Sequence, residues 1–376
     1  MYYLKQYNIV LAKFNIYFDN FGYRVEDFTF DESKKELLPL NLVSSNEGMA
    51  SWLKNRSIPK NREFVDSILV RTFIGNNNIK GIIDICKGLS LNDSYWVSSD
   101  DFNKTFEEVN LYENRFSNIL GLIAFTGFGS SIKSSFLSSP EFTTNGMLAK
   151  CWRRINGKIY LYKSGTTGAA NTGLEPYSEY YASQIAKCMG IDHVEYNISK
   201  WRKKLCSTCE LFTDINHSFM PISYLIKINS FLDIINYYKK MGEDYYNALS
   251  DMIVFDAIIC NTDRHYGNFG LIIDNKTNKP IKTAPIFDNG LSLFNYAMDD
   301  NLKSVESAIE YSKTRHPACY ADFISVAKEV MTDSTKSKLK NLINFKFKKH
   351  PRYNLNDKRL KILEKIIQIR VLELLN

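Results

Sequence analysis

The chain has 376 residues, of which 44% are hydrophobic and 24% are charged, and these proportions are typical of a globular protein with one or two cores. Seven cysteines form no regular framework, the longest apolar stretch covers only residues 119–125, and the first residues are polar, so composition argues against a disulfide-stapled scaffold, a transmembrane segment and a signal peptide. The net charge of +7 is modest and the basic run at 346–352 is more typical of a solvated face than of a polyanion site, so we expect a cytoplasmic protein that makes no sequence-specific DNA contacts itself.

The first 130 residues are predicted to form an N-terminal module of mixed α/β structure. Residues 1–35 are rich in β-branched and aromatic residues, which indicates strands and turns. Ser45 can cap a helix that begins near Gly48, and further helices are expected over about 61–70 and over 79–89. The pattern leaves three roles open for this module: docking, choice of substrate, or bracing of the region that follows.

Residues 131–205 begin with a stretch rich in Ser, Thr, Gly and Pro, which is typical of a boundary or a mobile loop. Asn156-Gly157 is the strongest short hairpin signal, and it predicts paired strands over 148–154 and 159–163. A Gly/Thr-rich loop then leads to a helix over about 177–189, which Gly190 ends.

Residues 206–376 are predicted to be mainly helical. A strongly apolar helix is expected over 244–260, and an amphipathic helix from Lys358 to the end of the chain. Between them, two strands over 269–273 and 281–286 are joined by a polar turn and read as a hairpin.

Three polar residues around this hairpin make the most specific chemical proposal in the sequence. Asn268 directly precedes the first strand and Asp288 follows the second, so the open end of the hairpin brings both side chains together. Carboxylate and amide oxygens suit Mg²⁺, which takes only one or two protein carboxylates beside phosphate and water. Asp263, in the loop before the hairpin, can orient and deprotonate a hydroxyl. Each residue alone is more typical of a turn, but the combination predicts a phosphotransferase.

A phosphotransferase also needs groups that hold the nucleotide. Lys163 ends the second strand of the Asn156-Gly157 hairpin, and Glu179 on the next helix could pair with it. Asn145 and Gly146 lie in a loop whose backbone amides can cradle phosphates. His265 either orients its own loop, the one that carries Asp263, through hydrogen bonds or fills a partly buried position.

Taken in order, these motifs resemble the HipA family of bacterial serine/threonine kinases, over roughly residues 135–300 and most specifically in the stretch Asn261-Thr262-Asp263-Arg264-His265-Tyr266-Gly267-Asn268-Phe269-Gly270. The resemblance implies an α+β, two-lobed protein-kinase-like fold that is distantly related to phosphoinositide kinases. In such a fold, residues 1–130 are the mixed α/β N-terminal module, 131–205 the small lobe, and 206–376 the mainly helical large lobe.

The resemblance also implies roles for the site residues, with ATP and Mg²⁺ as cofactors. Asp263 is then the catalytic base, and Asn268 and Asp288 bind Mg²⁺. The groups on the ATP side are Lys163, its helix partner Glu179, Asn145, Gly146 and His265.

Family members phosphorylate proteins, some of them aminoacyl-tRNA synthetases, and often act as toxins paired with a small DNA-binding antitoxin. Some autophosphorylate a serine in the phosphate loop, for which this chain offers Ser138, Ser139, Thr143 and Thr144 without a choice among them. Two other functions stay open from the sequence: a lipid or small-molecule kinase with the same ATP site, and an antitoxin-dependent transcriptional co-regulator.

Overall fold

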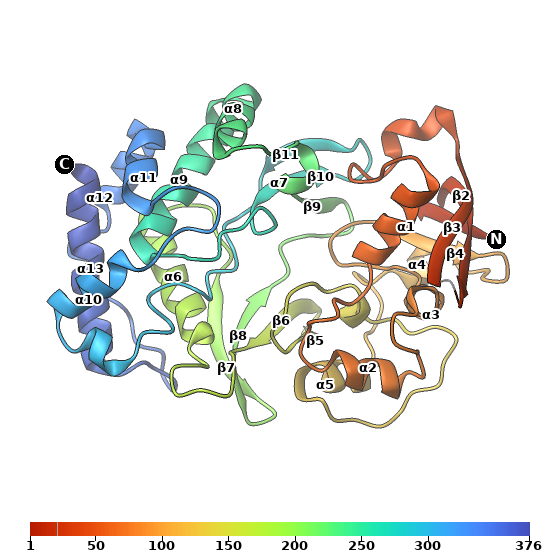
Figure 1. Cartoon of the computed structure of the whole chain (residues 1–376), viewed down its shortest axis with the longest axis horizontal. Helices are drawn as coiled ribbons and strands as arrows, with labels where there is room; N and C mark the ends of the chain where they lie inside the picture. Colours follow the sequence, from red (N-terminus) through yellow and green to blue (C-terminus); the bar gives the residue numbers. More distant parts are fainter. Residues whose placement is uncertain (21) are drawn as a thin grey trace. The chain divides into compact units, whose positions relative to one another are not determined.

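The computed structural model covers the whole chain and describes residues 1–20 and 22–376 (Figure 1). The chain divides into two compact units, each built from several segments. Unit 1 comprises residues 1–163, 211–220 and 272–281, and unit 2 comprises residues 164–210, 221–271 and 282–376. The sequence-based division at residues 130 and 205 separates three consecutive regions and not these two units, and it stays a prediction.

Unit 1 opens with a four-stranded antiparallel sheet of order β3-β2-β1-β4 (red and orange strands in Figure 1). Inward-facing Leu4, Leu11 and Phe14 pack with Trp52 of the first helix into one core, which explains why the β-branched and aromatic run forms strands. The strands are β1 (Tyr2–Gln6), β2 (Ile9–Asp19), β3 (Gly22–Phe30) and β4 (Tyr95–Ser99).

The helices of unit 1 begin close to where the sequence predicts them. The Ser45 hydroxyl accepts the N–H of Gly48 at 3.0 Å, so α1 starts at Asn46, two residues before the predicted position. The second helix starts later than predicted because Phe64 adopts a left-handed φ of 63° just before it. The helices are α1 (Asn46–Asn55), α2 (Val65–Arg71), α3 (Ile79–Cys86), α4 (Phe106–Val109) and α5 (Asn118–Thr126).

The hairpin predicted from Asn156-Gly157 is present as β5 (Lys150–Ile155) and β6 (Lys158–Ser164). Asn156 and Gly157 have φ values of 50° and 82°, the left-handed pair that a two-residue type I′ turn requires. The register places Lys150 directly opposite Lys163, so their side chains leave the same face of the ladder.

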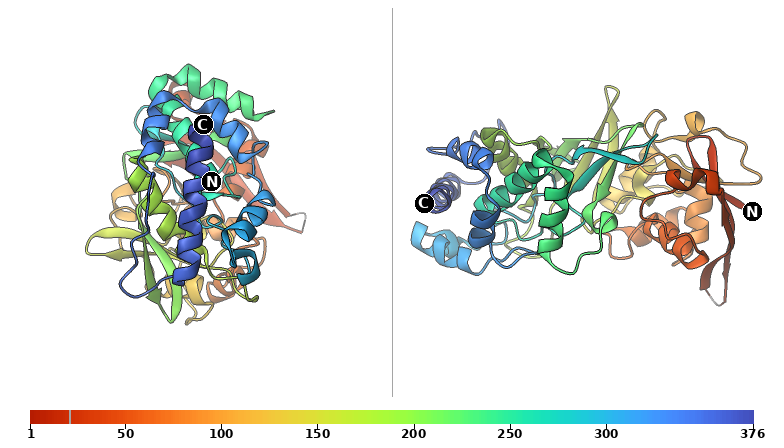
Figure 2. Two further views of the ribbon diagram at one scale, coloured as in Figure 1. Left: turned by 90° about the vertical axis from the view of Figure 1, so that its left-hand side faces the viewer. Right: turned by 90° about the horizontal axis from the view of Figure 1, so that it is seen from above.

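Unit 2 is mainly helical, as predicted. Helix α9 (Glu243–Ile259) is buried along most of its length and packs against α8, α11, α12 and the long α13 (Asp357–Leu375), which Figure 2 shows in blue. Gly190, with a φ of 75°, ends α6 (Glu175–Met189), which packs on the antiparallel pair β7 (Tyr196–Trp201) and β8 (Lys204–Glu210). The remaining helices are α7 (Ile222–Leu225), α8 (Phe231–Met241), α10 (Val305–Lys313), α11 (Phe323–Val330) and α12 (Asp333–Lys340). Within the described ranges, no helix combines the length and apolar character that crossing a bilayer requires.

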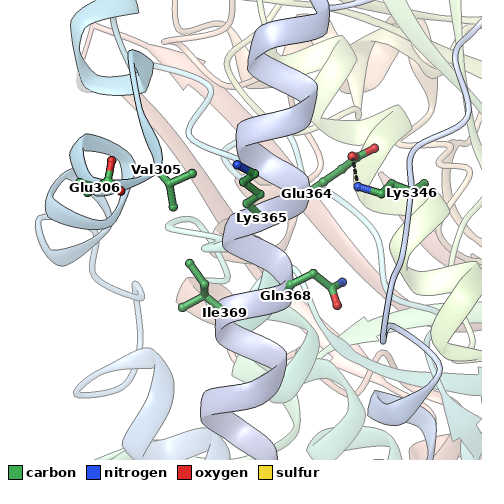
Figure 3. A pocket seen from close by; sticks show the side chains of 7 residues that line it. All are labelled: Val305, Glu306, Lys346, Glu364, Lys365, Gln368 and Ile369. Atoms are coloured by element: carbon green, nitrogen blue, oxygen red, sulfur yellow. Dashed lines mark hydrogen bonds and ion pairs between the residues drawn. The ribbon is translucent and has the colours of Figure 1, made fainter.

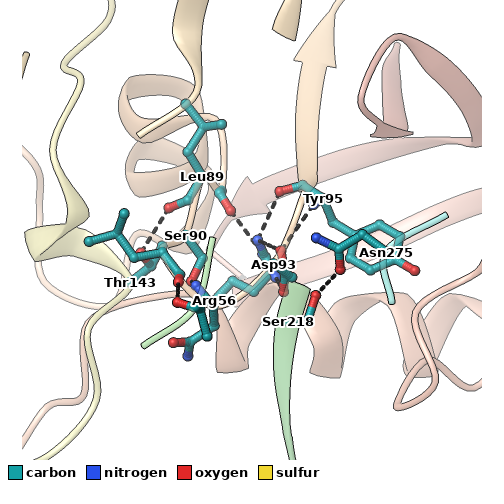
Figure 4. Close-up of polar contacts among 12 residues, drawn as sticks. Arg56, Leu89, Ser90, Asp93, Tyr95, Thr143, Ser218 and Asn275 are labelled. Carbon is teal, nitrogen blue, oxygen red and sulfur yellow. Dashed lines mark hydrogen bonds and ion pairs between the residues drawn. The ribbon is translucent and has the colours of Figure 1, made fainter. Parts of the chain in front are cut away.

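The second predicted hairpin consists of β10 (Gly270–Asp274) and β11 (Lys279–Thr283), with β9 (His217–Pro221) beside β10. Its tip belongs to unit 1 and is fastened by side-chain amides. Asn275 accepts the hydroxyl of Ser218 (Figure 4) and donates to the carbonyl of Ile215 at 3.0 Å. Asn278 donates to the carbonyls of Glu36 and Leu38 at 2.9 and 2.8 Å. The turn is therefore fastened to unit 1 through Asn275 and Asn278, while Lys276 and Thr277 between them are exposed.

Candidate active site

The loop that carries Asp263 is shaped by the end of α9. Cys260 takes a left-handed φ of 53° and stops the helix, and the fully buried Asn261 then bonds in two directions. Its Nδ2 donates to the Asp256 carboxylate at 3.1 Å, and its Oδ1 accepts the backbone N–H of Asp263 at 3.1 Å. The backbone of Asp263 is thus fixed by a buried amide, while its side chain is only partly buried. This placement suits a base that must reach an external hydroxyl.

Arg264 is the structural centre of the site. Its guanidinium is fully buried and forms a bidentate pair with Asp256 at 2.9 and 3.1 Å. It also donates to the carbonyls of Asn268 and Phe287 and to the side chain of Asn289 at 2.6 Å. Burial alone would lower the pKa of Arg264, but the Asp256 charge and its hydrogen bonds more than offset this, so the pKa is raised and the group stays charged. One cation therefore ties the backbone beside each predicted metal ligand to α9.

Asp288 lies five residues after the end of β11 at Thr283. It has a left-handed φ of 56°, which Asp tolerates better than most residues, and its N–H donates to the Tyr196 hydroxyl at 3.1 Å. Burial raises the pKa of Tyr196 well above its usual value, so this hydroxyl stays neutral and can accept the bond. The next N–H, that of Asn289, donates to the Glu179 carboxylate at 2.7 Å. Glu179 is completely buried and thus braces the Asp-Asn-Gly turn.

Asn268 is oriented by its own hydrogen bond. Its Nδ2 donates to the Asp263 carbonyl at 3.1 Å, which leaves Oδ1, the atom that binds cations, on the other side of the amide. Together with the Asp288 carboxylate this gives hard oxygen donors of the kind that Mg²⁺ prefers. The described part of the chain holds no cluster of three or more His, Cys, Asp or Glu side chains that could bind a metal alone. The donor set therefore fits an ion that completes its shell with phosphate and water.

His265 is exposed, and its Nδ1 accepts the N–H of Gly267 at 3.0 Å. A Cβ at position 267 would lie 2.9 Å from the imidazole ring, so any other residue there would displace the ring from this position. The ring thus shapes the turn between Asp263 and Asn268, which agrees with a loop-orienting role and not with a buried filler. Contact of His265 with a nucleotide stays a prediction.

The residues predicted to hold ATP phosphates lie in unit 1. Lys163 is partly buried near the end of β6, and Asn145 and Gly146 are exposed at the tip of the preceding loop. Lys150, opposite Lys163, donates from Nζ to the Asn145 carbonyl at 2.8 Å. A Cβ at Gly146, which has a φ of 91°, would lie 2.2 Å from that Nζ, so only glycine fits. The loop is thus closed by a lysine that the sequence did not single out. Since Glu179 belongs to unit 2, its pairing with Lys163 stays a prediction.

Of the four residues predicted as autophosphorylation candidates, Ser139 and Thr143 are buried, and Ser138 and Thr144 are partly buried. Ser139 accepts the N–H of Glu141, Thr143 donates to the Leu89 carbonyl at 2.8 Å, and Thr144 donates to the Pro140 carbonyl at 2.7 Å. The hydroxyl of Ser138 is buried. Phosphorylation of Ser139 or Thr143 would therefore require the loop to open first.

The pocket in Figure 3 lies away from the predicted site. It measures about 400 Å³ and is lined by α10, by α13 and by Lys346, the first residue of the basic run. Glu364 on its wall pairs with Lys346 at 2.7 Å and also accepts the N–H of Phe347 at 3.0 Å. It contains none of the residues predicted for ATP, metal or catalysis, and part of the basic run is thereby engaged in packing on α13.

Sequence reasoning missed the buried partners of the site. Asp256 lies in the apolar second half of α9, where an Asp next to Phe, Ala and Ile is the signal that could have found it, because a buried carboxylate needs a cation. Arg264 was noticed but not given a role. Lys150 received no role from the sequence, because no local pattern distinguishes it from an exposed strand lysine, whereas here it is 7% exposed.

Comparison with known proteins agrees with the motifs. No protein-family model matches the chain. The chain is 27% identical over 159 residues to the serine/threonine-protein kinase CtkA of Helicobacter pylori. The matched segment covers 37% of this chain and 47% of CtkA, so the chain spans about half the length of this curated relative.

Among solved structures, HipA of Shewanella oneidensis, from a complex of the toxin–antitoxin proteins HipA and HipB with operator DNA, matches with a TM-score of 0.52 at 9% identity. The match covers 99% of this chain and 96% of that chain. The crystal structure of the Helicobacter pylori proinflammatory kinase CtkA covers 62% of this chain and 90% of that chain, with 18% identity and a TM-score of 0.48. The predicted resemblance to HipA-like kinases is confirmed, and the chain has a HipA-like mixed α/β fold.

Proposed function

We propose that this chain is a serine/threonine protein kinase of HipA type that transfers the γ-phosphoryl group of ATP, with Mg²⁺, to a protein hydroxyl. The observation that carries the proposal is the Arg264 centre, which links the backbone carbonyls of Asn268 and Phe287 and the side chain of Asn289 to one buried carboxylate, that of Asp256. A purely structural turn has no need to order two oxygen ligands in this way. The sequence similarity to CtkA over the matched segment supports the same reaction class.

In this proposal each residue has one task. Asp263 accepts the proton of the substrate hydroxyl and orients its oxygen for attack. Asn268 and Asp288 would hold Mg²⁺, which neutralises charge on the phosphates when it is bound. On the nucleotide side, Lys163, Asn145 and Gly146 bind phosphate oxygens, and Lys150 shapes their loop. Because Lys150 and Lys163 are like charges directly opposite each other, a triphosphate beside both would offset their repulsion.

The test is transfer of label from γ-labelled ATP in the presence of Mg²⁺. We expect the wild-type protein to label itself or an added protein, and Asp263→Ala and Asp288→Asn to lose about 10²-fold or more of that rate. Asp300→Asn is the matched control, because Asp300 is an exposed carboxylate in unit 2 outside the site. Transfer that persists undiminished in Asp263→Ala would refute the assignment of the base.

The same assay separates the alternatives. Label that enters phosphoinositides and no protein would favour a lipid kinase with the same ATP site. The substrate, which the resemblance suggests is a translation protein such as an aminoacyl-tRNA synthetase, would be identified by phosphoproteomics after expression of the wild type against Asp263→Ala. Autophosphorylation would place the label in the peptide that contains Ser138, Ser139, Thr143 and Thr144.

A small DNA-binding antitoxin is the partner that we propose. The HipA chain whose fold this protein shares was solved together with HipB and operator DNA. We expect this chain to retard DNA only when such a partner is present. DNA retardation by the chain alone at physiological salt would contradict this expectation and favour direct contact through basic patches.

A further inference from the structure

The loop that precedes β5 is held by a single arginine from the N-terminal region. Arg62 is 2% exposed, and its Nη1 donates to the carbonyls of Glu141 and Thr144 at 2.8 and 3.2 Å. Its Nη2 donates to the carbonyl of Lys150 and pairs with the Glu141 carboxylate, both at 2.8 Å. One guanidinium thus joins the beginning, the middle and the end of the loop, using the planar fork that lysine lacks.

The next residue holds the part of the loop that Arg62 does not reach. The N–H of Glu63 donates to the Met147 carbonyl at 2.7 Å, and its carboxylate accepts the N–H of Ala149 at 3.1 Å. Both residues stand directly before α2, whose Ile68 is fully buried in a core of unit 1. The two contacts are therefore made from the turn that leads into a helix anchored in that core.

The loop side of the contact is equally ordered. The second carboxylate oxygen of Glu141 accepts the N–H of Trp152 at 2.8 Å, and the Trp152 indole donates to Thr144 at 2.9 Å. Thr143 bonds to the carbonyl of Leu89, as Figure 4 shows. Burial raises the pKa of Glu141, and the charge of Arg62 opposes that rise. Every anchored part of the loop thus has a partner, while Asn145 and Gly146 at its tip stay exposed.

We propose that Arg62 and Glu63 are positioning residues that hold the phosphate loop in its nucleotide-binding conformation, so that the N-terminal module braces the ATP site. This inference rests on the proposed function, since it takes the backbone at Asn145 and Gly146 as the part that meets the phosphates. A loop that is ordered before binding loses less conformational entropy when the nucleotide arrives. Removing the brace therefore weakens ATP binding more than it slows the chemical step.

The experiment measures loop order and kinetics on the same full-length variants. Hydrogen exchange of peptides within residues 139–150 and steady-state kinetics against ATP are compared for Arg62→Lys, Glu63→Ala and Glu63→Gln. We expect exchange about tenfold faster and a KM for ATP about tenfold higher in Glu63→Ala, because a hydrogen bond to a charged group is lost. The kcat should stay within about twofold. Glu63→Gln should restore both values, since its amide oxygen can accept the N–H of Ala149.

Arg56→Lys is the matched control. Arg56 is also a buried arginine in unit 1, and it bonds to the carbonyls of Gly88 and Tyr95 and to Asp93 but to no residue of the loop (Figure 4). It should leave loop exchange and the KM for ATP unchanged. Should Arg62→Lys fail to fold, the partly buried Glu63 still provides the test.

The outcomes separate the brace from the proposed kinase activity. Faster loop exchange with an unchanged KM for ATP would overturn the positioning role, as would unchanged exchange in Glu63→Ala. Wild-type protein that binds no ATP would overturn the proposed function, while the exchange data would still report whether Arg62 and Glu63 order the loop.

Discussion

Substitution of Arg264 by lysine should lower both the free energy of unfolding and the rate of phosphoryl transfer, each by a measurable amount. The guanidinium makes five hydrogen bonds, two of them to Asp256, whereas an ammonium group has only three donors. At least two bonds to or from a charged group are lost, and each contributes about 1.5–3 kcal/mol. We therefore expect Arg264→Lys to lower the free energy of unfolding by about 3–5 kcal/mol.

The catalytic effect of this substitution should exceed what partial unfolding explains. Freed carbonyls at Asn268 and Phe287 let both predicted metal ligands shift, and a misplacement of about 1 Å can cost about 100-fold in rate. Urea denaturation gives the stability, and label transfer at increasing Mg²⁺ in the folded range gives kcat and the Mg²⁺ requirement. Asp256→Asn keeps the shape of the side chain but removes the counter-charge of Arg264. It should therefore also lower the stability and kcat.

Arg359→Lys is the comparison for Arg264→Lys. Arg359 is a buried arginine of unit 2 that donates to the carbonyls of Phe294 and Ala297. The Arg359→Lys protein should have a lower free energy of unfolding but an unchanged Mg²⁺ requirement. Two results would show that Arg264 does not organise the site. One is an Arg264→Lys protein that unfolds at the same urea concentration as the wild type. The other is an Arg264→Lys protein whose kcat and Mg²⁺ dependence are as unchanged as those of Arg359→Lys.

Three further outcomes follow from the described contacts. Tyr196→Phe removes the acceptor of the Asp288 N–H, so a Mg²⁺ titration of activity should need several-fold more metal, and an unchanged requirement would show that this bond does not place the ligand. Asn275→Ala removes the side-chain hydrogen bonds that hold the hairpin tip to Ser218 and Ile215. It should lower the free energy of unfolding in chemical denaturation by about 2–3 kcal/mol, because buried polar groups lose their partners; no change would mean that the tip is loose in solution. Burial raises the pKa of Cys319 to about 12, and its thiol donates to the Arg264 carbonyl, so mass spectrometry should find it unalkylated by iodoacetamide at pH 8 in native protein and alkylated in urea. Rapid native alkylation would contradict the packing of this segment on the catalytic loop.

The contacts of the N-terminal module bear on the three roles that the sequence left open for it. Of docking, substrate choice and bracing, the contacts of Arg62 and Glu63 favour bracing. The fastened tip of the β10–β11 hairpin points the same way, because Asn278 bonds to carbonyls at Glu36 and Leu38. Two segments that the sequence places in the kinase region are thus ordered by residues that precede it by a long stretch of chain.

Local patterns determined much of what the sequence alone could predict. The type I′ turn at Asn156-Gly157, the cap at Ser45 and the helix end at Gly190 each depend on backbone conformations that only a few residue types favour, so single residues announce them. The hairpin between Asn268 and Asp288 was also readable from the sequence, although β11 ends at Thr283, five residues before Asp288, and the joint role of the two side chains stays a prediction.

Tertiary structure alone decided which distant residues hold the site in place. Arg62 and Glu141 are separated by 79 positions, and nothing in either neighbourhood marks the other. Asp256 and Arg264 are close in sequence but meet only because a left-handed residue turns the chain back after α9. A buried charge requires a partner, but the partner is chosen by how the segments pack, and that choice has no local signature in the sequence.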